Sequence, residues 1–318
     1  MPLKLIPDNT NIGFVKLRFV AFALTLLLTI GAAGLLAVRG LNLGVDFVGG
    51  LTMQVEFAQA PALDTLRTRV DKVGVGDSAL QEFGNNRTIL IRLPLPKDAE
   101  VDQGAVQRVV AKVRVALEKD YQGVKFARVE SVSGKVSGEL ISDGLKAVGL
   151  SMLFVALFTW FRFEWYFGVS TVVALVHDVV VTMGFFALTQ LEFDLNIVAA
   201  VLTIIGYSLN DKVVIDDRIR ENLRKYRQMD IKQIIDLSVN ETLPRTVMTS
   251  LTLLAALTAL LLLGPEVIFG FTAAMVLGIV VGTYSSIFVS SSLLISLGVK
   301  PRAAPVEDRR AKGAERIG

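Results

Sequence analysis

Four ionisable side chains in or at the start of long apolar stretches stand out as residues whose types and placement could do chemistry: His177, Asp178, Asp211 and Arg245. Each such group costs about 2.5–3.5 kcal/mol on membrane-insertion scales, so each is a functional candidate. A carboxyl group in hydrocarbon favours its neutral form, and a nearby arginine favours its charged form. A carboxylate that alternates between these surroundings takes up and releases a proton. Proton coupling is therefore one chemistry that these residues could perform.

Asp211 has the most informative neighbours. Tyr207, Asn210 and Asp211 are spaced at i, i+3 and i+4, so we expect them to share one helical face. One interpretation is that Asp211 carries a proton. The other is that it pairs with Arg245 or Lys212 only to hold helices together. The residue pattern leaves both open.

The other membrane charges also allow two interpretations each. Arg245 is the expected counter-charge to Asp211, although an arginine in the first turn of a span often extends to the lipid headgroups instead. Asp178 lies mid-span, where a structural hydrogen bond and a role in a proton relay are both open. Adjacent helical residues point about 100° apart, so His177 and Asp178 are not expected to face the same partner.

A small-residue motif, Gly278-Ile279-Val280-Val281-Gly282, has the GxxxG spacing that lets two membrane helices approach closely. Because this spacing is common in membrane helices, it indicates helix packing at Gly278 and Gly282 rather than a substrate path.

The composition places these residues in a membrane protein. The chain has 318 residues, 52% of them hydrophobic and only 20% charged, and the apolar residues come in runs of roughly twenty, about a bilayer's thickness. This excludes an ordinary cytosolic enzyme and a disordered protein. There is no cysteine and only one histidine, which excludes disulfides and a multi-histidine metal site. A net charge of +3 is too small to indicate nucleic-acid binding.

Hydropathy predicts six transmembrane helices. They are expected at residues 19–38, 145–161, 166–188, 195–215, 246–263 and 267–297. Lys and Arg are concentrated before the first span, between the second and third, between the fourth and fifth, and after the last. With six spans, all these segments lie on one side, so we expect both termini to be cytoplasmic.

The segment 40–139, between the first two spans, is expected to form an external domain. Alternating and helical spacings predict the order β-α-β-β-α-β, which is that of a ferredoxin-like α+β fold. We find no catalytic constellation in it, which favours a binding or docking role. The expected organisation is a cytoplasmic N-terminus with the first span (1–39), this domain, five further spans (140–298) with a cytoplasmic loop at 216–244, and a cytoplasmic tail (299–318).

Several strings together resemble the SecD/SecF family of protein-export subunits, within the resistance-nodulation-division superfamily. They are Gly44-Val45-Asp46-Phe47-Val48-Gly49-Gly50, Val173-Ala174-Leu175-Val176-His177-Asp178, Ile205-Gly206-Tyr207-Ser208-Leu209-Asn210-Asp211, Asp217-Arg218-Ile219-Arg220-Glu221-Asn222, Thr242-Leu243-Pro244-Arg245-Thr246 and Gly282-Thr283-Tyr284-Ser285-Ser286. The resemblance covers nearly the whole chain, in the expected order.

The resemblance implies a bacterial inner-membrane subunit that pairs with SecD and acts with the SecYEG channel, with YajC and indirectly with the motor SecA. Its other expected partners are the preprotein substrate, which it would help to draw out on the far side, and membrane lipid. It implies no nucleic acid, no cofactor and no enzyme activity. The proton-motive force would promote preprotein movement and release, with the positions of Asp211 and Arg245 linked to proton transport. The family usually has a small polar residue where this chain has Lys212. That lysine either stabilises a charged Asp211 or points to a different face.

Two other functions stay open at this point. The chain could be a structural scaffold of an export complex, with its membrane charges holding helices together. It could also be half of a proton-driven efflux transporter, although the external domain is small for a solute-funnelling assembly. No G-x-x-x-x-G-K-[ST] phosphate loop is present, so energy would come from a gradient or from another protein.

Overall fold

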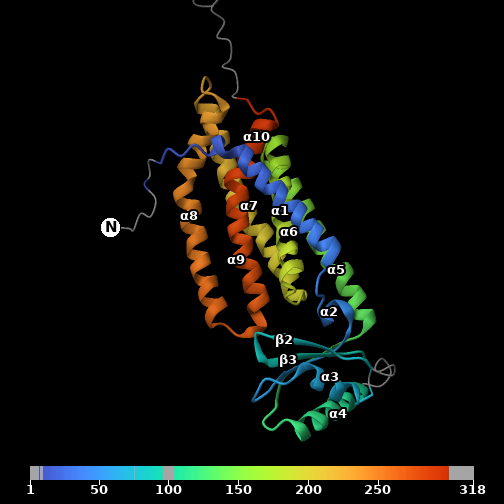
Figure 1. Cartoon of the computed structure of the whole chain (residues 1–318). Helices are drawn as coiled ribbons and strands as arrows, with labels where there is room; N and C mark the ends of the chain where they lie inside the picture. The colour runs from blue at the N-terminus through green and yellow to red at the C-terminus, as the bar shows by residue number, and fades with distance from the viewer. Residues whose placement is uncertain (1–6, 8–9, 75, 96–103, 301–318) are drawn as a thin grey trace, which may run out of the picture.

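The computed structural model describes residues 7, 10–74, 76–95 and 104–300, and it consists of a helix bundle with a small α+β domain at one end (Figure 1). Within these described residues, six helical segments are long and apolar enough to cross a membrane. They are Phe14–Arg39, Gly134–Arg162, Trp165–Thr189, Leu195–Lys225, Ile231–Leu263 and Glu266–Ser296. The predicted six-helix membrane fold is confirmed.

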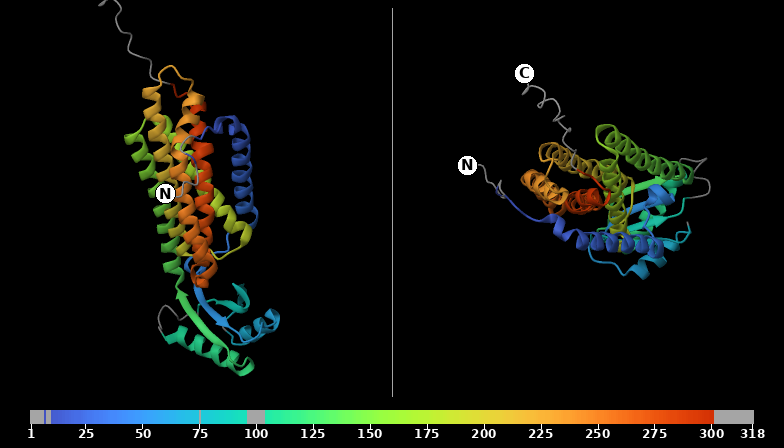
Figure 2. Two further views of the ribbon diagram at one scale, coloured as in Figure 1. Left: turned by 90° about the vertical axis from the view of Figure 1, so that its left-hand side faces the viewer. Right: turned by 90° about the horizontal axis from the view of Figure 1, so that it is seen from above.

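The elements of the bundle follow the chain in a simple order. The first crossing is η1 (Phe14–Leu17) with α1 (Arg18–Arg39), followed after the domain by α5 (Gly134–Arg162), α6 (Trp165–Thr189), α7 (Leu195–Lys225) and α8 (Ile231–Leu263). The last crossing joins η2 (Glu266–Ile268), α9 (Phe269–Tyr284), the π-helical turn η3 (Ser285–Ser290) and α10 (Ser291–Ser296). Seen from above, α6 lies between α1 and α5 (Figure 2).

The segment 216–244, which the sequence predicted as a loop, is mostly helical. Helix α7 continues to Lys225 and α8 begins at Ile231, so only five residues between them lie outside the helices. Apolar side chains from the two extensions, among them Ile219, Leu223 and Ile235, are buried against each other. Hydropathy marks where a helix is apolar all round, and an amphipathic extension that packs on one face falls outside that signal.

The α+β domain has the predicted order of elements. These are β1 (Gly50–Glu56), α3 (Leu63–Asp71), β2 (Ala79–Phe83), β3 (Asn85–Leu93), α4 (Gly104–Asp120) and β4 (Lys125–Val132). The sheet order is β2-β3-β1-β4, and every neighbouring pair is antiparallel. This is the ferredoxin-like arrangement. Residues 96–103 of the expected domain and most of the predicted tail (299–318) lie outside the described residues.

A short helix, α2 (Val45–Val48), joins the first crossing to the sheet through two consecutive glycines. Gly49 and Gly50 both have positive φ angles, 75° and 127°. A Cβ atom on Gly50 would lie 2.8 Å from the carbonyl oxygen of Leu93. Only glycine avoids both the left-handed strain and this clash, so the Gly-Gly pair allows the chain to enter the central strand of the sheet.

Helix α1 contacts the bundle mainly through α6. At the closest approach a Cβ atom on Gly184 would lie 2.3 Å from the Cβ atom of Ala32. A side chain at position 184 therefore cannot be accommodated unless the helices separate.

We expect Gly184→Ala to destabilise the packing of α1 by about 1–3 kcal/mol, the usual cost of overpacking a close contact. Gly31→Ala is the matched control, because a Cβ atom at Gly31 would meet nothing within 4 Å. Thermal unfolding in detergent should show a lower midpoint for Gly184→Ala and an unchanged midpoint for Gly31→Ala. Equal midpoints for the two variants would contradict this packing.

Candidate functional site

The centre of the bundle holds a buried ion pair between α6 and α7. The Nζ atom of Lys212 lies 3.0 Å from Oδ2 of Asp178, and the two side chains are 0% and 1% exposed. The hydroxyl groups of Ser208 and Ser285 donate hydrogen bonds to the same carboxylate oxygen, at 2.6 and 2.9 Å. Lys212 also donates to both serines. A cation and two hydroxyls thus converge on one oxygen of Asp178.

The π-helical turn η3 brings the last crossing into this cluster. Ser285 is its first residue, and π-turns inside α-helices are frequent at functional sites. Close approach of α9 to α7 depends on the two glycines of the GxxxG motif. A Cβ atom on Gly278 would lie 2.4 Å from Ile204, and one on Gly282 would lie 3.0 Å from Oγ of Ser208. Both glycines therefore lie at a tight helix contact.

His177 faces away from this cluster, toward α1. Its Nδ1 atom lies 2.7 Å from Oγ1 of Thr29, and its ring is 6.5 Å from that of Tyr284. The Nε2 atom is buried without a hydrogen-bond partner in the described part of the chain. His177 and Asp178 therefore have different partners, as their helical positions predicted.

Asp211 lies beside the cluster but outside its hydrogen bonds. Its side chain is 3% exposed, and Oδ2 is buried with no hydrogen-bond partner among the described residues. Arg245 is exposed on α8 and forms no ion pair with any described carboxylate. Lys212, the alternative partner, binds Asp178 instead. The structure thus leaves Asp211 as a buried carboxyl group without a bonded counter-charge.

The face around Asp211 is only partly as the sequence predicted. Tyr207 is half-buried, and its hydroxyl group lies 2.9 Å from Oγ of Ser250, which in turn lies 2.8 Å from Oγ1 of Thr283. These hydroxyls connect α7, α8 and α9. Asn210 is exposed at the bundle surface rather than directed inward with Asp211.

A third buried carboxylate, Asp216, is absent from the predicted site. It is 1% exposed, its Oδ2 atom lies 3.3 Å from Oγ1 of Thr171, and its Oδ1 atom has no partner among the described residues. Hydropathy ended the predicted span one residue before it. The signal that could have found it is the spacing of Ser208, Lys212 and Asp216 at i, i+4 and i+8, which places all three on one face of α7.

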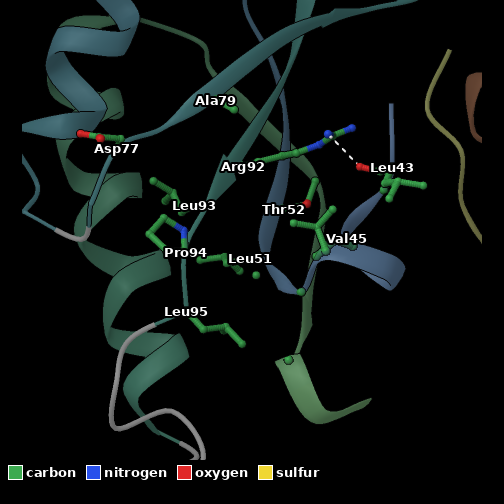
Figure 3. Close-up of a pocket in the computed structure, with 15 residues that line it drawn as sticks. Leu43, Val45, Leu51, Thr52, Asp77, Ala79, Arg92, Leu93, Pro94 and Leu95 are labelled. Atoms are coloured by element: carbon green, nitrogen blue, oxygen red, sulfur yellow. Dashed lines mark hydrogen bonds between the residues drawn. The ribbon is translucent and has the colours of Figure 1, made fainter. Parts of the chain in front are cut away.

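The domain is joined to the bundle by a polar contact centred on Arg92 of β3. Its Nη2 atom lies 2.9 Å from Oε1 of Glu192, and Nη1 donates to Oδ1 of Asn42 and to the carbonyl oxygen of Leu43. Figure 3 shows Arg92 reaching across to Leu43 beside a groove of about 500 Å³. At the other end of the domain, Asn85 donates to Glu266, 3.2 Å away, at the start of the last crossing. The sheet thus contacts two different inter-helix connections.

Burial raises the pKa of Glu192, although Arg92 opposes this effect. A raised pKa means that the folded state favours the protonated form of Glu192. The ionised form of Glu192 is stabilised in the fold by the positive charge of Arg92. We therefore expect Arg92→Gln to cost about 1–2 kcal/mol at neutral pH and Glu192→Gln to cost less.

The pH dependence follows from the same shift. Protonation of Glu192 relieves the uncompensated charge, so the Arg92→Gln variant should regain stability relative to the unmodified chain as the pH falls toward the ordinary range of glutamate. Unfolding midpoints of the two single variants and the double variant, measured at two pH values, check this. Equal costs of the two single variants at both pH values would contradict the asymmetry.

Comparison with known proteins matches this architecture along the chain. Residues 112–300 match the family described as "Protein export membrane protein SecD/SecF, C-terminal", and residues 34–61 match the SecD/SecF GG motif. The chain is 41% identical over 317 residues to a protein translocase subunit SecF from Cereibacter sphaeroides, covering 97% of this chain and 96% of the relative. It is 43% identical over 288 residues to one from Desulfurispirillum indicum, covering 89% and 91%.

Two solved structures are similar to the fold. The crystal structure of SecDF from Thermus thermophilus, titled a translocon-associated membrane protein, superimposes with a TM-score of 0.84 at 33% identity, covering 92% of this chain. A SecDF structure in a super-membrane-facing form gives a TM-score of 0.65 at 31% identity, covering 99% of this chain. The chain spans 39% of the first of these longer chains and 41% of the second.

Proposed function

The chain belongs to the SecF family of protein translocase subunits, a multi-pass membrane component of the protein-export machinery, and from this premise we propose that it pairs with SecD and uses the proton-motive force to promote preprotein translocation and release. In this role the chain is a transport subunit rather than an enzyme. The chain would act after SecA has driven the preprotein through SecYEG, and YajC would be an accessory partner.

One observation carries the proton step: Asp211 is a carboxyl group buried within a crossing helix, with Oδ2 unpartnered among the described residues. A structural carboxylate would be expected to have its hydrogen bonds satisfied, as Oδ2 of Asp178 does. Asp211 instead has room to exchange a proton with a group that the partner subunit brings. Arg245, exposed on the neighbouring helix, supplies the positive charge that favours its ionised form.

The surface that would face SecD is the exposed polar strip on α7 and α8. Asn210, Arg245 and Thr249 are exposed there, although both helices are apolar enough to cross a membrane. Polar groups in a membrane helix face the interior of a bundle or a cavity, so a partner should cover this strip. The same geometry favours placement of the fourth and fifth spans, α7 and α8, against SecD.

Asp178 belongs to this proposal as a second, less exposed proton site, with His177 and Tyr207 as supporting groups. Its Oδ1 atom is buried and unpartnered among the described residues, while Oδ2 is held by Lys212 and two serines. The domain is the candidate for coupling to the preprotein, because Arg92 and Asn85 join it to two different inter-helix connections at the same end of the bundle.

The proposed location is the bacterial inner membrane, with both termini in the cytoplasm and the domain outside. The sheet lies at the end of the bundle opposite α10 (Figure 1). Among the described residues, the Lys and Arg before α1, at the end of α5 and around the α7–α8 connection lie at the end where α10 ends, which is the arrangement that the positive-inside rule favours.

Inner-membrane vesicles with and without this chain test the proposal. Completion of preprotein export should depend on the proton gradient when the chain and SecD are both present, and this dependence should disappear when the chain is left out. Equal sensitivity to the gradient with and without the chain would leave a scaffold role. Recovery of the chain in affinity purification without any SecD-like or SecY-like partner would instead favour an efflux half-transporter.

A further inference from the structure

A pocket of about 570 Å³ lies at the end of the bundle opposite the sheet, between the end of α5 and the last turns of α7. Its lining consists entirely of charged side chains: Arg162, Asp217, Arg220, Glu221, Arg224 and Lys225. Four are basic and two are acidic, which leaves an excess of two positive charges. None of these residues takes part in the buried site around Asp178 and Asp211.

The two carboxylates of the pocket are already engaged. Asp217 lies 3.1 Å from Arg162, and Glu221 pairs at 2.7 Å with Arg218, which lies outside the lining. The remaining cations, Arg220, Arg224 and Lys225, form no ion pair with a carboxylate in the described parts of the chain. The pocket therefore presents several uncompensated positive charges on one concave surface.

Arg220 is held in place by the pocket wall. Its Nη1 atom donates to the carbonyl oxygen of Arg162 at 3.2 Å, and its guanidinium lies 5.8 Å from the centre of the Phe163 ring. A guanidinium fixed on one side in this way presents its remaining Nη donors to an oxyanion in the pocket.

The surroundings of the pocket are those of a membrane interface. Trp160 and Phe161, in the last turn of α5, are 69% and 88% exposed, and Trp165 at the start of α6 is 52% exposed. Aromatic side chains concentrate where hydrocarbon meets headgroups. Exposed apolar side chains such as Phe154 continue along α5 toward the membrane interior. An anion in the pocket would therefore lie at headgroup level, with apolar surface beside it.

We propose that this pocket binds the phosphate headgroup of an anionic phospholipid, with the acyl chains lying along the exposed face of α5. A lipid headgroup and free phosphate would both present a phosphate oxyanion to the pocket. The adjoining aromatic and apolar surface favours a lipid as its source over a free phosphate, because a soluble ligand would gain nothing from it. Basic pockets between membrane helices on the cytoplasmic side are suited to such headgroups.

Native mass spectrometry of the full chain in neutral detergent tests the proposal, with phosphatidylglycerol as the probe and phosphatidylcholine as the zwitterionic comparison. We expect saturable retention of phosphatidylglycerol and little retention of phosphatidylcholine. Arg220→Gln and Arg224→Gln should each weaken binding about fivefold, the effect of one basic residue near an anionic lipid surface. Lys232→Gln, an exposed cation outside the pocket, should leave it unchanged.

A further variant and a soluble competitor extend the lipid-binding experiment. Glu221→Gln removes a negative charge from the pocket and should tighten binding, which covers the case in which the arginine variants fold poorly. Glycerol phosphate, which carries the headgroup chemistry without acyl chains, should displace the lipid only at far higher concentration. The proposal is overturned if the two lipids are retained equally, if Lys232→Gln weakens binding as much as the pocket variants, or if glycerol phosphate competes at equal concentration.

Discussion

Replacing Lys212 with methionine is expected to destabilise the bundle by about 3–5 kcal/mol, because it leaves the carboxylate of Asp178 buried without its cation. The ion pair is fully enclosed, so water cannot take the place of the ammonium group. Ser208 and Ser285 would still donate hydrogen bonds, but neither compensates a charge. The expected readout is a large fall in the thermal unfolding midpoint in detergent.

The double variant Asp178→Asn with Lys212→Met separates a charge effect from simple loss of packing. Removal of both charges should restore most of the lost stability, since a neutral pair in a buried site is often as stable as an ion pair. Lys232→Met is the matched control, because that lysine is exposed on α8. If the double variant is less stable than Lys212→Met, the pair contributes through shape and hydrogen bonding, and the charge argument fails.

Much of the fold could be predicted because its signals are local. An apolar run of about twenty residues marks a span on its own, and alternation with a period of two marks the first strand of the domain, at residues 51–57. The ends of α7 and α8 could not be predicted in this way. Their outer turns are amphipathic and are stabilised by side chains such as Leu223 and Ile235, which meet only in the folded hairpin.

The residues of the site could be predicted from the sequence, but the contacts between them could not. A charge inside an apolar run is visible in the sequence, so Asp178 and Asp211 could be identified. The packing of the bundle determines which faces of α6 and α7 meet, and the sequence does not show this. In the packed bundle Lys212 contacts Asp178 rather than its neighbour Asp211. Lys212 thus acts on a different carboxylate from the one beside it in sequence.

Asp211 is a buried carboxyl group without a bonded counter-charge, and its replacement is expected to have the largest effect on function. Asp211→Asn keeps the size of the side chain and its capacity to hydrogen-bond, but it cannot ionise. If Asp211 carries the proton, export in vesicles should fall to the level seen when the proton gradient is collapsed, and collapse of the gradient should then have no further effect. Unfolding midpoints should change little, because Oδ2 of Asp211 has no hydrogen bond to lose among the described residues.

Two further variants distinguish loss of a proton carrier from damage to the bundle. Asp211→Glu keeps an ionisable group and should retain part of the gradient-dependent export, whereas Asp230→Asn, at an exposed carboxylate between α7 and α8, should retain all of it. Arg245→Gln should reduce gradient-dependent export without abolishing binding to SecD, because it removes the nearby positive charge and leaves the carboxyl group in place. Export that responds fully to the gradient in Asp211→Asn would exclude this residue as the proton carrier, and the unpartnered Oδ1 atom of Asp178 would then be the next position to test.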